Sequence, residues 1–202
     1  MSSAETEPAD GERFVGEDWY GEDLSDRVFT GCEFRDVDLT EATSRGASFT
    51  SCVFRECRFN ASTHEASSFA GCEFRRTSFF DATFDGCRMN GSVFVACTLR
   101  PVNVRGGQWR GVTIRGTKLM RLELAGLNLA ESDLTESDLS DTDLSGADLS
   151  GALLRGTVLH GTDLRRATLD RADLVSADLR ETRLDVAGAV LLAEAHGAVV
   201  EP

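Results

Sequence analysis

ESDLTESDLSDTDLSGADLSG, the stretch from residue 131 to residue 151, repeats every five residues. Leucine occupies positions 134, 139, 144 and 149, and an aspartate directly precedes each of these leucines. A period of five fits neither an α-helix, with about 3.6 residues per turn, nor a flat strand, with a period of about two. A short fixed period over a long span is typical of a solenoid, in which each unit buries its apolar side chain by stacking on its neighbours.

The same frame extends over most of the chain. We call the central residue of each repeat i; from 14 to 184 it falls on every residue number that ends in 4 or 9. Large apolar residues fill this column except at Ser44 and His64. With 41% hydrophobic residues overall, chance would fill fewer than half of these positions. The five-residue frame is therefore real.

The other columns of the repeat also favour particular residue types. All six cysteines fall at i−2, a column otherwise dominated by Ala, Ser, Thr and Val, which predicts small, inward-facing side chains. Sixteen of the 19 glycines fall at i+2, where a chain that turns a corner every five residues favours a residue with free φ. Positions i−1 and i+1 are mostly polar, as solvent-facing sites should be.

Three segments carry a family resemblance: ADLSG at 147–151, ADLVS at 172–176 and ADLRE at 177–181. They resemble the pentapeptide-repeat family, and the resemblance covers nearly the whole chain. It implies an all-β fold, a right-handed quadrilateral β-helix with four repeats per coil. The first half, rich in phenylalanine and cysteine, the segment GSVFVACTLRP at 91–101 and the ending LDVAGAVLLAEAHG resemble more narrowly the MfpA type, related in function to the Qnr proteins.

Composition limits the possible partners. The formal net charge is −13, with 34 acidic and 21 basic residues, which argues against nucleic acid and anionic membranes as direct partners. A basic or DNA-binding protein is the natural counterpart. The longest apolar run is too short to cross a bilayer and no secretory leader is apparent, so we expect a cytoplasmic protein.

Three regions follow from the frame. We expect a disordered acidic tail at 1–13, the β-helix at 14–184 and, after the frame stops, a short α-helix and tail at 185–202. Asp185 is the expected N-cap and Gly197 the expected stop. The apolar helix residues would either cap the open end of the β-helix or pair with a second copy, and the resemblance to MfpA favours both, a homodimer joined through its C-terminal ends. The expected dimer interface comprises Val186, Val190, Leu191 and Leu192.

The cysteines and histidines do not suggest catalysis. Cys32, Cys52 and Cys72 would stack in successive coils, where free cysteine packs as a small hydrophobe, and a line of thiols is not a metal site. His64 is interpreted as a hydrogen-bonded core histidine or a local bulge. No phosphate loop, activated nucleophile or metal-ligand spacing is present, so we expect no enzyme activity, no cofactor and no metal.

A basic segment lies in the middle of the chain. Arginines 100, 105, 110 and 115 occupy i+1 of four consecutive repeats and would form a collar with one arginine on each face. The collar either balances the charge of neighbouring acidic coils or contacts a partner. Pro101 lies at the start of this segment, where it would be tolerated at a corner and would allow the rod to bend.

The acidic residues after this collar suggest a function. The aspartates at i−1 of residues 131–151 would encircle one coil, and three later ones continue their columns. The expected partner-binding surface comprises Glu131, Asp133, Glu136, Asp138, Asp141, Asp143, Asp148, Asp163, Asp173 and Asp178. The resemblance implies a DNA mimic that binds the DNA-binding saddle of DNA gyrase, modulates the enzyme and protects it from fluoroquinolones. The alternative is a scaffold for another protein, because aspartate at i−1 is common in this family.

Overall fold

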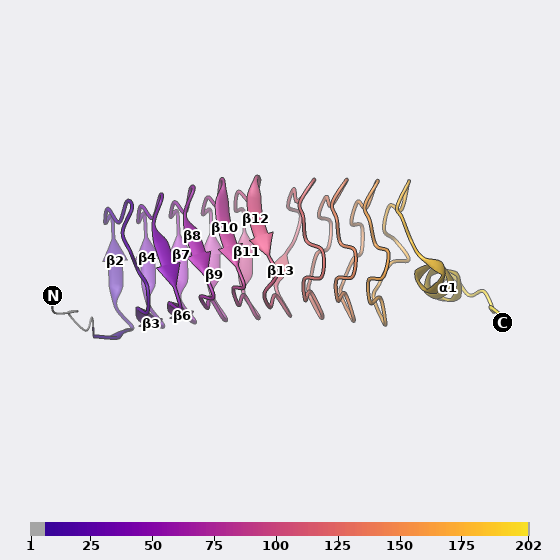
Figure 1. Cartoon of the computed structure of the whole chain (residues 1–202), viewed down its shortest axis with the longest axis horizontal. Helices are drawn as coiled ribbons and strands as arrows, with labels where there is room; N and C mark the ends of the chain where they lie inside the picture. The colour runs from indigo at the N-terminus through magenta and orange to yellow at the C-terminus, as the bar shows by residue number, and fades with distance from the viewer. Residues whose placement is uncertain (1–6, 202) are drawn as a thin grey trace.

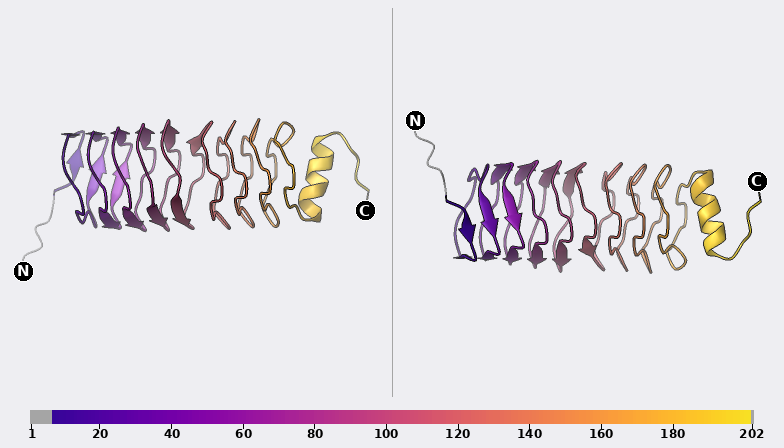
Figure 2. Two further views of the ribbon diagram at one scale, coloured as in Figure 1. Left: turned by 90° about the horizontal axis from the view of Figure 1, so that it is seen from above. Right: turned by 90° about the horizontal axis from the view of Figure 1, so that it is seen from below.

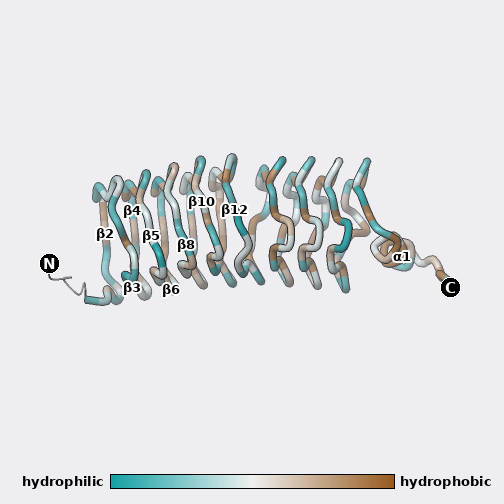
Figure 3. The backbone as a smooth tube through the Cα atoms, viewed as in Figure 1, coloured by the Kyte–Doolittle hydropathy of each residue, from teal (hydrophilic) through white to brown (hydrophobic). Residues whose placement is uncertain are grey.

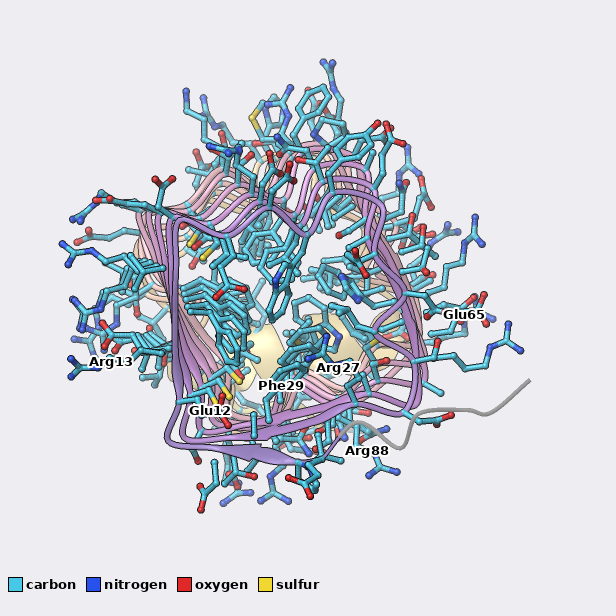
Figure 4. The ribbon with its side chains drawn as sticks, turned by 90° about the vertical axis from the view of Figure 1, so that its left-hand side faces the viewer. Glu12, Arg13, Arg27, Phe29, Glu65 and Arg88 are labelled. Atoms are coloured by element: carbon cyan, nitrogen blue, oxygen red, sulfur yellow. The ribbon has the colours of Figure 1, made fainter. Side chains whose placement is uncertain are left out.

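The computed structural model describes residues 7–201, which wind into a β-helix whose coils stack along one axis (Figure 1). Strand pairing is parallel and joins residues 20 apart, as in Ala9↔Phe29 and Phe34↔Phe54. Four repeats therefore make one coil, and the view along the axis shows a four-sided outline (Figure 4). The predicted right-handed quadrilateral β-helix is confirmed.

We name the four faces by their core residues. Face A is centred on residue 9 and every twentieth residue after it, face B on 14, face C on 19 and face D on 24, and each face takes the residues from i−2 to i+2. Face A contains β1 (Ala9–Asp10), β3 (Val28–Thr30) and β6 (Ser48–Thr50). Face B contains β2 (Arg13–Val15), β4 (Glu33–Arg35), β7 (Val53–Arg55), β9 (Glu73–Arg75), β11 (Val93–Val95) and β13 (Thr113–Ile114). Face D contains β5 (Thr43–Arg45), β8 (Thr63–Glu65), β10 (Ala82–Asp85) and β12 (Val102–Arg105).

Isolated parallel bridges replace strands throughout face C, on face A after β6, on face D after β12 and on face B after β13. The core residues also change along the rod. In the first half, phenylalanine rings stack from coil to coil, with Phe49 and Phe69 at 4.8 Å between ring centroids and 3° between planes. In the second half, leucines such as Leu144 and Leu149 fill the column and are fully buried. Hydrophobic and hydrophilic residues alternate along the coils of both halves (Figure 3).

The corners are made at i+2, as predicted. Glycines there have positive φ, for example 67° at Gly146, but so do residues such as Glu131 and Asp141, at 59° and 57°. Every positive-φ residue other than glycine within 7–201 lies in this column. The turn geometry is therefore a property of the fold, and glycine is its preferred but not its required occupant.

The i−2 column supplies hydrogen-bond donors as well as small side chains. Cys32 Sγ donates to the carbonyl of Ala9 at 3.4 Å, and Thr142 Oγ1 donates to that of Leu119 at 2.8 Å. Each bond reaches 23 residues back and satisfies a core carbonyl of the preceding coil. All six cysteines are free thiols, and burial raises the pKa of Cys57 and Cys87 to about 11, so these thiols are protonated at neutral pH.

His64 is a hydrogen-bonded core histidine, one of the two interpretations that its position suggested. Its Nδ1 lies 2.7 Å from Ser44 Oγ, and its Nε2 lies 3.1 Å from Ser62 Oγ. Because the Ser62 hydroxyl already donates to the carbonyl of Phe59, Nε2 must donate to Ser62 and Nδ1 accept from Ser44. The two polar residues of the core column thus satisfy each other.

The ends of the β-helix differ from each other. At the N-terminal end, β1 already pairs with β3, so residues 9–13 belong to the coil although the sequence pattern predicted a tail there; residues 1–6 of that tail lie outside the described residues. At the C-terminal end, α1 (Val186–Ala195) crosses the last coil (Figure 2). Asp185 is its N-cap and accepts from Gly188 N at 2.9 Å, as predicted. Within residues 7–201, no helix is long and apolar enough to span a membrane.

The coils separate at one place. Between the coil that contains β12 and the next one, the gap is wider than between other neighbouring coils (Figures 1 and 2). Bridges cross this gap on face A (Gln108↔Asn128) and face B (Val93↔Thr113), whereas none within residues 7–201 crosses it on faces C and D. We call this two-sided opening the seam. The seam follows Pro101, where the sequence predicted that the rod could bend.

Candidate protein-binding surface

The four aspartates of residues 131–151 lie on the four faces of one coil. Asp133 is on face B, Asp138 on face C, Asp143 on face D and Asp148 on face A, each bridged to the residue 20 positions before it. The solenoid therefore brings these side chains to one level of the rod, as the sequence pattern predicts. Asp163, Asp173 and Asp178 continue the columns of faces D, B and C.

These aspartates also have a local structural role. Asp138 Oδ1 accepts from Ser140 N at 3.0 Å, and Asp143 Oδ1 accepts from Ser145 N at 2.8 Å. Asn128 makes the same bond to Ala130 N at 3.1 Å, so an amide serves this turn as well as a carboxylate. Aspartate at i−1 is thus partly a requirement of the fold, and its charge is available for binding only where no cation neutralises it.

Six of the ten residues of the predicted surface form ion pairs within the chain. These pairs are Glu131–Arg110, Asp133–Arg115, Asp141–Arg121, Asp163–Arg165, Asp173–Arg155 and Asp178–Arg180. The hydrogen bond from Arg165 lowers the pKa of Asp163 to about 2. The remaining four form no ion pair within residues 7–201; they are Glu136, Asp138, Asp143 and Asp148. These four carry the uncompensated charge of the predicted surface.

Charge is unevenly divided among the faces. Within residues 7–184, faces C and D together hold 17 acidic and 10 basic residues, whereas faces A and B hold 13 and 11. A hollow of about 240 Å³ at the edge between faces C and D is lined by Glu123, Asp141, Asp143, Asp163 and Arg183. Two adjacent faces, rather than a complete ring, therefore form the acidic side of the rod. Summing charge over every twentieth residue would have revealed this asymmetry from sequence.

The four arginines of the collar lie one on each face, as predicted. Charge balance explains only two of them. Arg100, Arg105, Arg110 and Arg115 lie on faces C, D, A and B respectively. Arg110 bonds to Glu131 at 2.7 Å and Arg115 pairs with Asp133, both in the acidic coil. Arg100 and Arg105 form no ion pair within residues 7–201. Phe80, at an i+1 position, is 53% exposed beside Arg100.

The four expected dimer residues divide into two pairs. Leu191 and Leu192 are half-buried and pack against the core, so they help α1 to cap the coil. Val186 is 82% exposed and Val190 is partly exposed. Within a single chain, α1 therefore caps the last coil, and Val186 remains exposed beside this cap.

No metal or cofactor site emerges from the described residues. Among residues 7–201, no three His, Cys, Asp or Glu side chains converge as metal ligands would. The hollows are open depressions between charged side chains, and the apolar cavity inside the rod, beside Trp109, measures only about 30 Å³.

Two family models match this repeating chain. The model described as a pentapeptide repeat region matches residues 57–134, and that described as pentapeptide repeats (8 copies) matches residues 23–63 and 147–185. The chain belongs to the pentapeptide-repeat family. A comparison with the curated proteins finds no match to this pentapeptide-repeat protein.

Solved structures give the same fold. Full-length QnrB1, described as a plasmid-mediated fluoroquinolone resistance protein, is 20% identical, with a TM-score of 0.73 over 95% of this chain and 100% of QnrB1. A trypsin-treated point variant of QnrB1 is also 20% identical, with a TM-score of 0.52 over 96% of this chain and 99% of the other. At this identity the likeness establishes a Qnr-like pentapeptide-repeat fold and leaves function to be argued from the surface.

Proposed function

We propose that this pentapeptide-repeat protein binds DNA gyrase at its DNA-binding saddle by acting as a mimic of duplex DNA, modulates its activity and protects it from fluoroquinolones. The observation that carries this proposal is the concentration of net negative charge on faces C and D. The protein also shares its fold with QnrB1, which is named a fluoroquinolone resistance protein, and this likeness supports the same proposal. A gyrase partner implies a cytoplasmic location and a binding rather than a catalytic role.

The physical basis is charge on a narrow, regular rod. Stacked coils rise by ~4.8 Å each, whereas duplex DNA carries one charge per ~1.7 Å of axis. The protein's field is therefore sparser than that of DNA, and binding must rely on placing carboxylates such as Asp138 and Asp143 opposite particular cations of the partner. Uncompensated carboxylates in repeating columns provide that placement.

Dimerisation would lengthen this rod. Val186 on α1 is exposed beside half-buried Val190, and Val199 and Val200 in the segment that follows are 86% and 41% exposed. Pairing of two such ends through apolar contacts would cover these residues and place two acidic rods end to end. We therefore include a homodimer joined through its C-terminal ends in the proposal.

A second candidate function has support of its own. The aspartates at i−1 accept turn hydrogen bonds, so part of the acidity follows from the fold alone, as in Asp138 and Asp143. A structural or scaffolding protein with a different partner would carry the same aspartates. The two candidates differ in whether acid removal on faces C and D affects gyrase.

The deciding experiment measures gyrase supercoiling and fluoroquinolone-induced DNA cleavage with wild type and two charge-matched variants. Asp138→Asn with Asp143→Asn removes two uncompensated charges from faces C and D, and asparagine keeps the turn acceptor, as Asn128 does. Asp148→Asn with Glu136→Gln removes the same charge from faces A and B. We expect the first variant to lose ~10-fold or more in potency, at roughly 1 kcal/mol per lost contact, and the second to lose little.

Two outcomes would contradict the proposal in different ways. If wild type affects neither supercoiling nor drug-induced cleavage at micromolar concentration, gyrase is not the partner and the scaffold function is favoured. If both variants act like wild type, gyrase is the partner but the acidic faces do not mediate binding.

A further inference from the structure

The seam leaves backbone groups unpaired on both of its sides. At the other core positions, apart from Leu154, the N–H of residue i bonds to the carbonyl of residue i+19, as from Trp19 to Asp38 at 2.8 Å. Within residues 7–201 the equivalent bonds from Leu99 to Lys118 and from Val104 to Glu123 are missing. The N–H groups of Gly106, at a corner, and of Lys118 and Glu123, at i−1, also make no backbone bond across the seam. Two short strand edges therefore face each other without partners.

These edges are close to solvent. On face C the seam opens into a hollow of about 650 Å³, lined by Phe80, residues 96–101 and residues 115–118. On face D it opens into a hollow of about 260 Å³ between residues 101–105 and 121–123. The core residues Val104 and Leu124 are 9% and 8% exposed, whereas Leu144 is completely buried. Unpaired strand edges that a second chain can reach are sites for strand addition.

The lining of the seam is basic in an acidic rod. The two hollows contain five cationic side chains and a single carboxylate, Glu123. Arg105 and Lys118 form no ion pair within residues 7–201, and the only hydrogen bond from the Arg100 side chain goes to the thioether of Met120, a weak acceptor, at 3.3 Å. The hollow at the edge of faces C and D has the opposite composition, four carboxylates and one arginine. Charge complementarity therefore selects an acidic occupant for the seam.

We infer that the seam is a docking site for an extended, acidic segment of a partner protein. The backbone of the segment pairs with the open edges at Leu99 and Val104, and its carboxylates meet Arg100, Arg105 and Lys118. A nucleic acid has the charge but lacks the alternating N–H and carbonyl groups that the edges require. A basic segment has the required backbone groups, but the cationic side chains that line the seam would repel it. This inference holds whichever protein the acidic faces bind.

The test uses a fluorescein-labelled heptapeptide that alternates valine and aspartate, titrated with the full-length protein and followed by fluorescence anisotropy. Two further peptides separate the contributions: valine alternating with lysine, and the aspartate peptide N-methylated at every second residue, so that one edge of its backbone cannot donate hydrogen bonds. We expect binding of the first peptide and loss of ~10-fold or more in affinity for the other two.

Charge-reversal variants locate the site. Arg100→Glu with Lys118→Glu should weaken the aspartate peptide ~10-fold or more, while Arg88→Glu with Arg171→Glu on face A should change its affinity less than ~2-fold. Slower hydrogen exchange at the amides of Leu99 and Val104 with bound peptide would support strand addition. The inference is overturned if the aspartate peptide does not bind at millimolar concentration, if N-methylation has no effect, or if the face A variant weakens binding equally.

Discussion

His64 shows how a polar residue is accommodated at a core position. It stacks on Phe84 with 5.3 Å between ring centroids and bonds to Ser44 and Ser62. Burial lowers its pKa to about 3, so it is neutral in the folded protein at physiological pH. The sequence pointed to this position because His64 interrupts the column of large apolar residues at i. It did not reveal the bond to Ser62, because that contact depends on the tautomer and on the turn of the same repeat.

Protonation of His64 should make stability depend on pH. Its pKa is lower in the folded state than in the unfolded chain, so the unfolded state gains a proton first as pH falls, and the stabilisation present above about pH 6.5 is lost progressively toward about pH 3. Between about pH 6 and about pH 5, wild type should lose up to ~1 kcal/mol more unfolding free energy than His64→Phe. Urea unfolding at both pH values tests this, and parallel losses in the two proteins would contradict it.

At the scale of elements, the five-residue period predicted the coils and the corners because each depends on one column, and the end of the period together with Asp185 predicted the C-terminal helix. The sequence did not predict the seam, since the residues around it keep the frame and only the backbone bonds between coils are lost. Nor did it show that the i−2 column supplies donors, because Cys32 and Thr142 reach carbonyls 23 residues away. Neighbouring-coil geometry was needed for both.

Gly107 tests the packing between neighbouring coils. Its φ is 103°, and a Cβ there would lie 2.3 Å from the carbonyl oxygen of Cys87, a backbone atom that cannot move aside. Gly107→Ala should therefore cost about 2 kcal/mol or more of unfolding free energy. As a matched control, Gly91→Asn lies at an open corner with φ of 68°, and should cost less than about 1 kcal/mol. Chemical denaturation that ranks the two variants in the reverse order would refute this account of the turn.

In the proposed homodimer, exposed residues of α1 join two rods end to end. Val186 is exposed in the first turn of the helix and Val190 follows it on the next turn. Val186→Glu with Val190→Glu should leave the coil folded and give a monomer, because two charges would face their copies across the proposed interface. Light scattering after gel filtration measures this against a wild-type dimer. A dimeric variant would show that the interface lies elsewhere.

At the scale of the whole rod, function depends on which sides carry net charge. The sequence predicted an acidic ring, and the solenoid does place Asp133, Asp138, Asp143 and Asp148 at one level. The composition of each face then concentrates net negative charge on faces C and D, the two faces on which the basic seam opens. A partner that binds this protein in place of DNA would contact those two faces.

The most direct measurement is displacement of labelled duplex DNA from gyrase by the purified protein, followed by anisotropy at about 50 mM and about 200 mM salt. DNA mimicry predicts complete displacement at saturation, with an apparent affinity that falls ~10-fold or more at the higher salt concentration. If gyrase instead holds the protein and the DNA duplex at the same time, the acidic faces do not occupy the DNA-binding saddle and the mimicry proposal is wrong.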